Sequence, residues 1–452
     1  MVETIPLRRQ PDYRLLWSAR AVSETGTHVT RLAVPLTAAT LLGATPTEMG
    51  LLTGAATLPY LLFGLHAGAY VDRLARRRPI MIGCELVAAA AVAAVPLAWF
   101  AGLLSTPLLI AVALVTGTCA VVYQTAWFPH IPSVVPEHQR TAAIAGFQAV
   151  YSTASVTGPG LAGILVQLLT APVALVADAA SFLVSALCLR SIRSPEPASR
   201  SGTAAGSPRR SLLRDIRDGV RAVTGNRVLW TLIGAGVLVN FASAGHMALY
   251  VLFAVHTLGL PAWVIGLLTA AYGAGGLVGA AVTPRLARRF SENRVILAGV
   301  LFFPLETAAL AAAHGSPVVL VPLLVAAYLV SGIAVVAFSV CYGTVQLRES
   351  PPEAVGRVNA VMTVSTMGVM TLGGVTGGVL GDLIGLRPAL WACAAVLVLA
   401  IALVWLSPLR HAPSHAPSAE PAPAPPAKRP AEPGPSRSTG HQAGEPSSTR
   451  HR

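Results

Sequence analysis

The stretch Arg73-Leu-Ala-Arg-Arg77 recurs unchanged as Arg285-Leu-Ala-Arg-Arg289, and further pairs of similar stretches accompany it in the same order. They are Arg14-Leu-Leu-Trp17 with Arg227-Val-Leu-Trp230, Gly50-Leu-Leu-Thr53 with Gly266-Leu-Leu-Thr269, and the glycine clusters Gly158–Gly163 and Gly373–Gly378. The offsets lie between 212 and 216 residues, so the register hardly drifts. Four ordered matches at nearly constant spacing indicate an internal duplication.

The composition places most of this duplicated chain in a membrane. Of its 452 residues, 54% are hydrophobic and only 11% are charged, whereas a soluble domain carries about 25% charged residues. This composition excludes a disordered protein, a disulfide scaffold and an ordinary soluble enzyme. Twelve membrane helices of about 20 to 25 residues each would use about 240 to 300 residues, which the length allows.

Apolar runs bounded by proline, glycine and charge predict twelve transmembrane helices. They lie near residues 15–42, 49–71, 79–102, 106–127, 140–168 and 172–190, and then near 228–256, 262–284, 294–313, 317–346, 356–382 and 388–409. We therefore expect an all-α membrane protein with two pseudo-symmetric bundles of six helices, at residues 15–190 and 228–409.

The remaining segments are expected on the cytoplasmic side, because arginines gather on alternate loops and the positive-inside rule then places both termini there. These segments are the N-terminus 1–14, a basic linker 191–227 and a disordered tail 410–452 rich in proline, alanine and serine. The linker contains an amphipathic stretch, 211–221, which fits either a basic helix lying on the inner leaflet or a solvated connection.

The net charge of +13 does not point to nucleic acid, because the arginine clusters lie between apolar spans. A phosphate-binding loop needs a lysine after its glycines, and the only lysine, Lys428, lies in the polar tail. The five cysteines fall inside apolar segments without the paired spacing of a metal site. We expect no enzymatic activity, no cofactor, no bound metal and a monomeric chain.

The segment Gly68-Ala-Tyr-Val-Asp72-Arg73-Leu-Ala-Arg76-Arg77-Arg78 resembles the loop between helices 2 and 3 of the major facilitator superfamily. Shorter stretches, such as Tyr13–Trp17 and Gly356–Asn359, resemble the branch that holds enterobactin exporters and macrolide-efflux-type pumps. The resemblance covers residues 12–409 and implies the major facilitator fold, whose two halves rock to expose a central site to each side of the membrane in turn.

In that family the loop implies a gating contact between the halves near helix 11. We therefore expect Gly68, Asp72, Arg73, Arg76 and Arg77 to act in gating. The aligned residue of the second half is Pro284, so the contact should depend on Asp72 alone. For Arg78 we expect only a topological role.

Within the fifth span, Gly158, Pro159 and Gly163 resemble the family's exporter signature, although Ala162 replaces one usual glycine. Proline removes a backbone hydrogen bond, and small residues let a neighbouring helix approach closely. Helix packing alone would also explain these glycines, but the Gly158-Pro159 pair favours the exporter interpretation.

Charged residues inside the spans are the candidates for coupling to protons or substrate, because charge at membrane depth usually faces a partner or a wet cavity. Glu24, His28 and Arg31 are spaced to share one face of the first helix, with Arg31 acting on Glu24, although a static ion pair would also fit. Glu306 lies in mid-span and Asp178 nearer a membrane face. Glu85, His246 and His256 are weaker candidates for the coupling or cavity residues.

These observations predict a secondary transporter of a bacterial cytoplasmic membrane that exports a small amphipathic molecule, of the drug, antibiotic or siderophore class, in exchange for protons. Its partners would be this substrate, protons and the lipid bilayer. Residues 106–127 contain no arginine, so the coupling arginine common in helix 4 of proton-driven drug pumps is absent. A nutrient importer of the same fold and a membrane receptor or scaffold are the alternatives.

Overall fold

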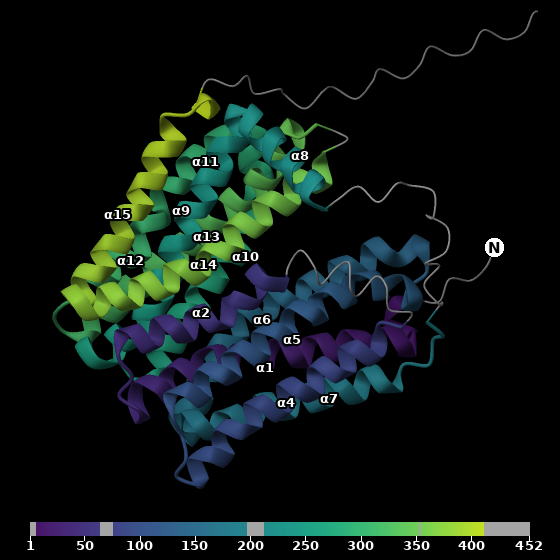
Figure 1. Cartoon of the computed structure of the whole chain (residues 1–452), viewed down its shortest axis with the longest axis vertical. Helices are drawn as coiled ribbons and strands as arrows, with labels where there is room; N and C mark the ends of the chain where they lie inside the picture. Colours follow the sequence, from purple (N-terminus) through teal and green to yellow (C-terminus); the bar gives the residue numbers. More distant parts are fainter. Residues whose placement is uncertain (1–5, 64–75, 197–211, 352–353, 411–452) are drawn as a thin grey trace, which may run out of the picture. The chain divides into compact units, whose positions relative to one another are not determined.

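The computed structural model describes residues 6–63, 76–196, 212–351 and 354–410, and all regular structure in these ranges is helical (Figure 1). With the labels of Figure 1, the helices are α1 (Pro11–Leu41), α2 (Pro46–Phe63), α4 (Arg78–Phe100), α5 (Thr106–Val134), α6 (Arg140–Leu169), α7 (Ala171–Ser191), α8 (Leu212–Gly225), α9 (Arg227–Leu252), α10 (Ala262–Phe290), α11 (Glu292–Gly299), α12 (Phe303–Ala312), α13 (Pro317–Glu349), α14 (Val355–Ile384) and α15 (Leu386–Trp405). The expected tail lies outside the described residues from 411 onward.

Ten helical segments of the described chain are long and apolar enough to cross a membrane. The helices α11 and α12 form one of them, joined by a 3-10 turn (Val300–Phe302) just before Pro304. The other two predicted spans are α1, which carries several charges, and α2, of which 18 residues are described. The predicted all-helical membrane fold is confirmed, and these two helices with the ten are consistent with the twelve spans expected.

Some helix ends differ from the sequence prediction. The expected end of the fourth span was residue 127, but α5 continues to Val134 through Pro129 and Pro132. The eighth span was expected to end at 284, but α10 continues as a helix through the arginines to Phe290. The predicted limits follow the apolar pattern, which marks the membrane, whereas a helix can continue into water beyond it.

We call α1, α2 and α4–α7 the first helix set and α9–α15 the second. Within the first set, α1 packs against α6 and α7, and α4 against α5 and α7; within the second, α9 packs against α14 and α15, and α10 against α13. Between the sets, α2 packs against α14 and α6 against α10. Equivalent helices of the repeat therefore make the contacts between the sets. The predicted domain limits at 190 and 228 stay a prediction.

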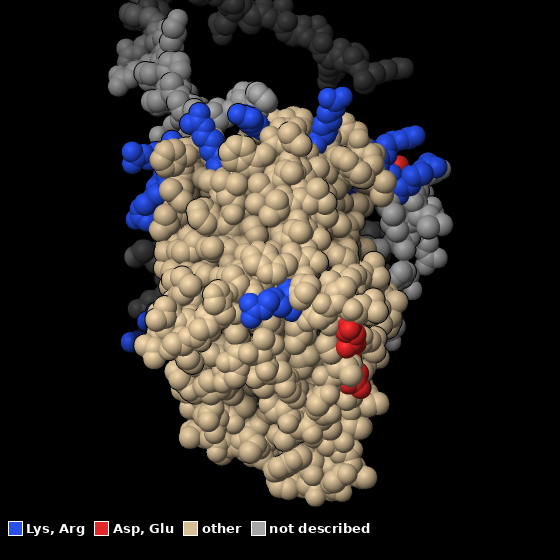
Figure 2. All heavy atoms as spheres, turned by 90° about the vertical axis from the view of Figure 1, so that its left-hand side faces the viewer, with Lys and Arg blue, Asp and Glu red and all other residues tan. Residues whose placement is uncertain are grey.

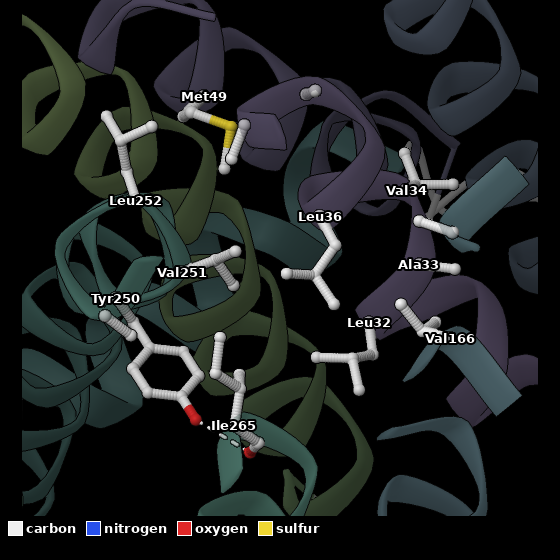
Figure 3. Packing of buried hydrophobic residues seen from close by; sticks show 14 of the residues in the cluster. Leu32, Ala33, Val34, Leu36, Met49, Val166, Tyr250, Val251, Leu252 and Ile265 are labelled. Atoms are coloured by element: carbon white, nitrogen blue, oxygen red, sulfur yellow. Dashed lines mark hydrogen bonds between the residues drawn. The ribbon is translucent and has the colours of Figure 1, made fainter. Parts of the chain in front are cut away.

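One apolar cluster continues across both helix sets. Leu32 and Leu36 of α1 lie opposite Val251 of α9 and Ile265 of α10, as Figure 3 shows. Lipid tails are as apolar as these side chains. Close packing therefore contributes much of what holds the two helix sets together here.

Two single-residue links at corresponding places of the repeat have the same unusual backbone, which Ser291 between α10 and α11 also adopts with φ 73° and ψ 152°. Gly385 joins α14 to α15 with φ 89° and ψ 158°, and Thr170 joins α6 to α7 with φ 82° and ψ 156°. Their separation matches the offset of the sequence repeat. Glycine adopts this conformation freely, but a threonine in it is strained because its Cβ crowds the backbone.

The helix ends at these links, together with the turns at 42–45, 258–261 and 313–316, form what we call the short-link end. The opposite ends carry Arg76–Arg78, Arg140, Arg285–Arg289 and Arg348, and we call them the basic end. On the face shown in Figure 2, most basic residues gather at one end above a band that is largely free of charge. Such a band fits the hydrocarbon region of a bilayer.

The helix α8 docks onto the basic end of the second helix set. Asp218 forms an ion pair with Arg357 of α14, with 3.1 Å between Oδ2 and Nη1. A Cβ on Gly219 would lie 2.9 Å from the carbonyl oxygen of Arg357, and Val223 is buried. The amphipathic stretch of the linker is thus helical and packs on protein with one face.

We predict that replacing Thr170 with glycine stabilises the protein by about 1 kcal/mol, because the strain of about 1 to 3 kcal/mol is partly offset by the greater freedom of an unfolded glycine. The reverse change, Gly385→Ala, should lower stability. Thermal unfolding in detergent would measure both, with Gly343→Ala as a control, since a Cβ there meets nothing within 4 Å. A lower unfolding temperature for Thr170→Gly would contradict the strain.

Candidate functional site

Glycines form the contact between α2 and α14, beginning at the short-link end. A Cβ on Gly50 would lie 2.6 Å from the carbonyl oxygen of Gly374, and one on Gly378 would lie 2.4 Å from that of Pro46. Side chains would not fit at these distances, so the two backbones touch directly. Farther along, the hydroxyls of Thr57 and Thr371 lie 3.1 Å apart.

The exporter-like signature lies at the equivalent crossing of α6 with α10. A Cβ on Gly163 would lie 3.0 Å from the carbonyl oxygen of Ala262, and one on Gly266 would lie 2.5 Å from that of Pro159. The other glycine of the signature faces α1 instead, because a Cβ on Gly158 would lie 2.7 Å from the Cβ of His28. Gly163 thus joins the helix sets, while Gly158 makes room for His28.

Two hydrogen bonds join the helix sets at the short-link end. Thr45 and Glu48 cap the start of α2 reciprocally, and Asp382 of α14 accepts a further hydrogen bond from the backbone N–H of Thr47, at 2.9 Å. Nε2 of His256 lies 3.0 Å from the carbonyl oxygen of Ala39 in α1. A carboxylate from the second helix set therefore satisfies a free donor at a helix N-terminus of the first.

The candidate coupling residues of α1 lie in three different surroundings. Glu24 forms an ion pair with Arg20, one turn earlier, and the guanidinium of Arg20 lies 5.3 Å from the ring centre of Trp127. His28 is buried against α6, and its Nε2 has no hydrogen-bond partner among the described residues. Arg31 is exposed. Glu24 thus pairs with Arg20, a partner that the sequence analysis missed. Among the described residues, no hydrogen bond or ion pair joins Glu24 to His28 or to Arg31.

Two buried carboxyl groups face α1 from neighbouring helices. Asp178 of α7 accepts hydrogen bonds from Thr30 of α1 and from Ser181 of its own helix. Glu85 of α4 accepts one from Ser185 of α7 at 2.9 Å. Both acids are therefore bonded to neutral hydroxyl groups, which satisfy a carboxyl group without supplying a counter-charge.

The approach of α1 to α7 depends on the glycine between these groups. A Cβ on Gly26 would lie 2.0 Å from the Ser181 hydroxyl oxygen and 2.3 Å from a carboxyl oxygen of Asp178. The small residue brings the backbone of α1 against the polar face of α7.

A half-open cavity of about 380 Å³ lies among the helices of the second set, and Glu306 of α12 lines it. Asn240 of α9 and Thr366 of α14 also line it, and all three lie near the middle of their spans. His246, in contrast, is buried beside this cavity, with its Nδ1 3.1 Å from the Thr307 hydroxyl. Neither histidine of the seventh span lines this cavity, since His246 is buried in protein and the exposed His256 bonds to Ala39 at the short-link end.

Gly68, Asp72 and Arg73 of the helix 2–3 loop lie outside the described residues, so their gating role stays a prediction. Of the others, Arg76 is exposed and Arg77 donates from its side chain to the carbonyl oxygen of Pro129, at 3.2 Å.

Arg78 does more than set topology, contrary to our expectation. Its Nη1 donates to the carbonyl oxygen of Ile192 at 2.7 Å, which ties the start of α4 to the end of α7. Glu196 completes this contact by accepting from the backbone N–H of Arg77 at 2.7 Å. The sequence analysis missed Glu196 because it lies in the linker.

The comparison with protein families identifies the class. The model described as transmembrane secretion effector matches residues 3–434, so the chain belongs to this family of major facilitator transporters. It is a multi-pass membrane protein of a transporter class, and the resemblance proposed from the helix 2–3 loop is confirmed.

Known relatives include efflux proteins. The chain is 29% identical to the multidrug efflux pump Tap of Mycolicibacterium fortuitum, covering 79% of this chain and 86% of that protein. It is 24% identical to macrolide efflux protein A of Streptococcus pyogenes, over 53% of this chain and 58% of that protein. A bacterial homologue of the iron transporter ferroportin, solved in an inward-facing state, has the same fold, with a TM-score of 0.69, 18% identity and coverage of 89% of this chain and 99% of that one.

We predict that Asp382→Ala loosens the short-link end, because it removes the acceptor of the Thr47 N–H and costs about 1 kcal/mol. The readout is maleimide labelling, in detergent, of a cysteine introduced at the buried Ala39, in a variant without the native cysteines. Labelling should become roughly fivefold faster. Glu137→Ala, at an exposed position of the basic end, is the control, and equal labelling of both variants would contradict the role of Asp382.

Proposed function

We propose that this transporter exports a small amphipathic molecule, of the drug, antibiotic or siderophore class, in exchange for protons. The two helix sets rock against each other, so that a central cavity opens to either side of the membrane in turn. The protein works as a monomer, with its basic end and both termini in the cytoplasm.

The position of the contacts between the two helix sets is the observation that supports this proposal. Gly50 and Gly378, Gly163 and Gly266, and the hydrogen bond of Asp382 all lie in the halves of their helices that lead to the short-link end. Contacts between glycine backbones can separate and close again with little rearrangement of side chains, whereas the apolar cluster around Leu36 and Val251 would have to repack. They support a pivoting motion, with this state closed on the outer side. The direction of transport rests on the efflux relatives.

Proton exchange needs a group that gains and loses a proton at membrane depth. Glu24, His28, Arg31, Asp178 and Glu306 are our candidates, because ionisable residues in membrane spans commonly belong to ion pathways. Asp178 bonds only to hydroxyl groups among the described residues, and Glu24 has a cation one turn away.

We predict that Glu24→Gln abolishes the response of transport to a pH gradient, because an amide cannot exchange a proton. Dye flux would be measured in reconstituted vesicles with and without an imposed gradient. Asp178→Asn tests the second candidate in the same assay, and Glu137→Gln is the control. If the gradient stimulates Glu24→Gln as strongly as the natural chain, Glu24 is not the coupling group.

We also propose that Asp72 holds the basic end closed during part of the cycle, as the family's loop implies. Asp72→Asn should lower the transport rate about tenfold, the value of one hydrogen bond to a charged group, while the amount of protein in the membrane stays the same. Flux per inserted molecule, with the amount measured by immunoblot, checks this. Unchanged flux would remove Asp72 from the gate.

A further inference from the structure

The cavity of the second helix set combines a mostly apolar wall with one acid. Its aromatic residues are Tyr272, Phe303, Phe338 and Tyr342. Phe303 and Phe338 pack edge to face, with their ring centres 4.9 Å apart. The volume of about 380 Å³ lies within the range of small-molecule sites. Such a wall suits a ligand with a flat or bulky apolar body.

The carboxyl group of Glu306 has an oxygen that lacks a hydrogen-bond donor within the described residues. Its Oε2 is buried and has no hydrogen-bond partner among the described residues. Protein surrounds the side chain, and Glu306 belongs to the lining of the cavity. A buried carboxyl oxygen without a donor is costly, so a donor is expected to come from a ligand or a proton.

The neighbouring tyrosines do not supply that donor. Tyr250 donates its hydroxyl to the carbonyl oxygen of Ile265 at 2.8 Å, and the Tyr328 hydroxyl lies 3.4 Å from Nε2 of His246. The polar groups of the wall leave further bonding capacity. The Tyr342 hydroxyl is buried without a partner in the described chain, and Asn240 donates its amide to Gly236, which leaves its carbonyl oxygen to accept.

The arrangement favours an organic cation over other ligands. A metal ion would need several ligands, and the described residues contain no cluster of three or more His, Cys, Asp or Glu side chains that could hold one. An anion would be repelled by the carboxylate. A cation that carries an N–H group can donate to Glu306, while the aromatic rings attract its charge and pack against its apolar body.

We propose that this cavity binds an amphipathic organic monocation with an N–H donor, which Glu306 recognises through its free carboxyl oxygen. Phe303, Phe338 and Tyr272 hold the apolar part of the molecule. This inference rests on the proposed function, since it names the chemical class of the molecule that the transporter moves.

The test uses the purified full chain in detergent with two fluorescent probes, ethidium, a cation with amino groups, and Nile red, an uncharged dye. Glu306→Gln should weaken ethidium binding at least tenfold and leave Nile red binding unchanged. Glu306→Asp should restore part of the ethidium affinity. Glu137→Gln controls for the loss of one negative charge, and unchanged Nile red binding shows that the cavity is intact.

Three results would overturn the inference. They are ethidium binding to Glu306→Gln with the affinity of the natural chain, an equal loss of both dyes in that variant, and no saturable ethidium binding to the natural chain. The second of these would mean that Glu306 only supports the cavity.

The two proposals fail separately. If Glu306 is needed for ethidium binding but vesicles with the natural chain show no flux of any dye, the cation site stands and the export proposal falls. If ethidium is transported equally well by the natural chain and Glu306→Gln, export stands and the cation site falls.

Discussion

The absence of side chains where helices cross is the constraint on which this molecule depends. In lipid, the hydrophobic effect does not drive helices together, so close contact between backbones has to supply much of the association. Gly50 against Gly374 and Gly163 against Gly266 supply it at equivalent crossings of the repeat. At these two crossings glycine backbones meet without interlocking side chains, unlike in the apolar cluster around Leu36 and Val251. One physical feature thus serves the assembly of the two helix sets and suits the pivoting motion that we propose.

Charge inside the membrane is placed differently in the two helix sets. In the first, Glu24 is neutralised by Arg20, Asp178 accepts from Thr30 of a neighbouring helix and Ser181 of its own, and Glu85 accepts from Ser185 of a neighbouring helix. In the second, Glu306 has an oxygen without a partner in the described chain and lines a cavity. An acid with a hydrogen-bond or ion-pair partner can support the fold or exchange a proton. An acid without such a partner, beside a cavity, is a candidate for binding a ligand.

The sequence predicted the fold class, the family and the position of nearly every span, because apolar runs and the internal repeat carry that information directly. It missed the helical arginines of α10 because hydropathy marks the membrane and not the end of a helix. Arg20 was within reach of the sequence, since it lies one turn before Glu24, a spacing typical of helical ion pairs.

Other features of the site depend on contacts between distant parts of the chain. The hydrogen bond from Thr47 to Asp382 joins residues 335 positions apart, and no local pattern indicates it. Like the contact that the family's loop implies for Asp72, this hydrogen bond joins the two halves at the eleventh span, but it lies at the short-link end. The position of Glu306 was evident from the sequence, while its aromatic surroundings required α10 and α13 to be in place beside α12.

The docking of α8 has a practical consequence. Because the Asp218–Arg357 ion pair and the close contact at Gly219 fix this helix to α14, we expect it to move together with the second helix set. A spin label or fluorophore at the exposed Arg221 would therefore report the orientation of that set. Arg221 belongs neither to the cavity nor to the two glycine crossings. With a second label on the first set, the distance between the two labels would follow the proposed conformational cycle in real time.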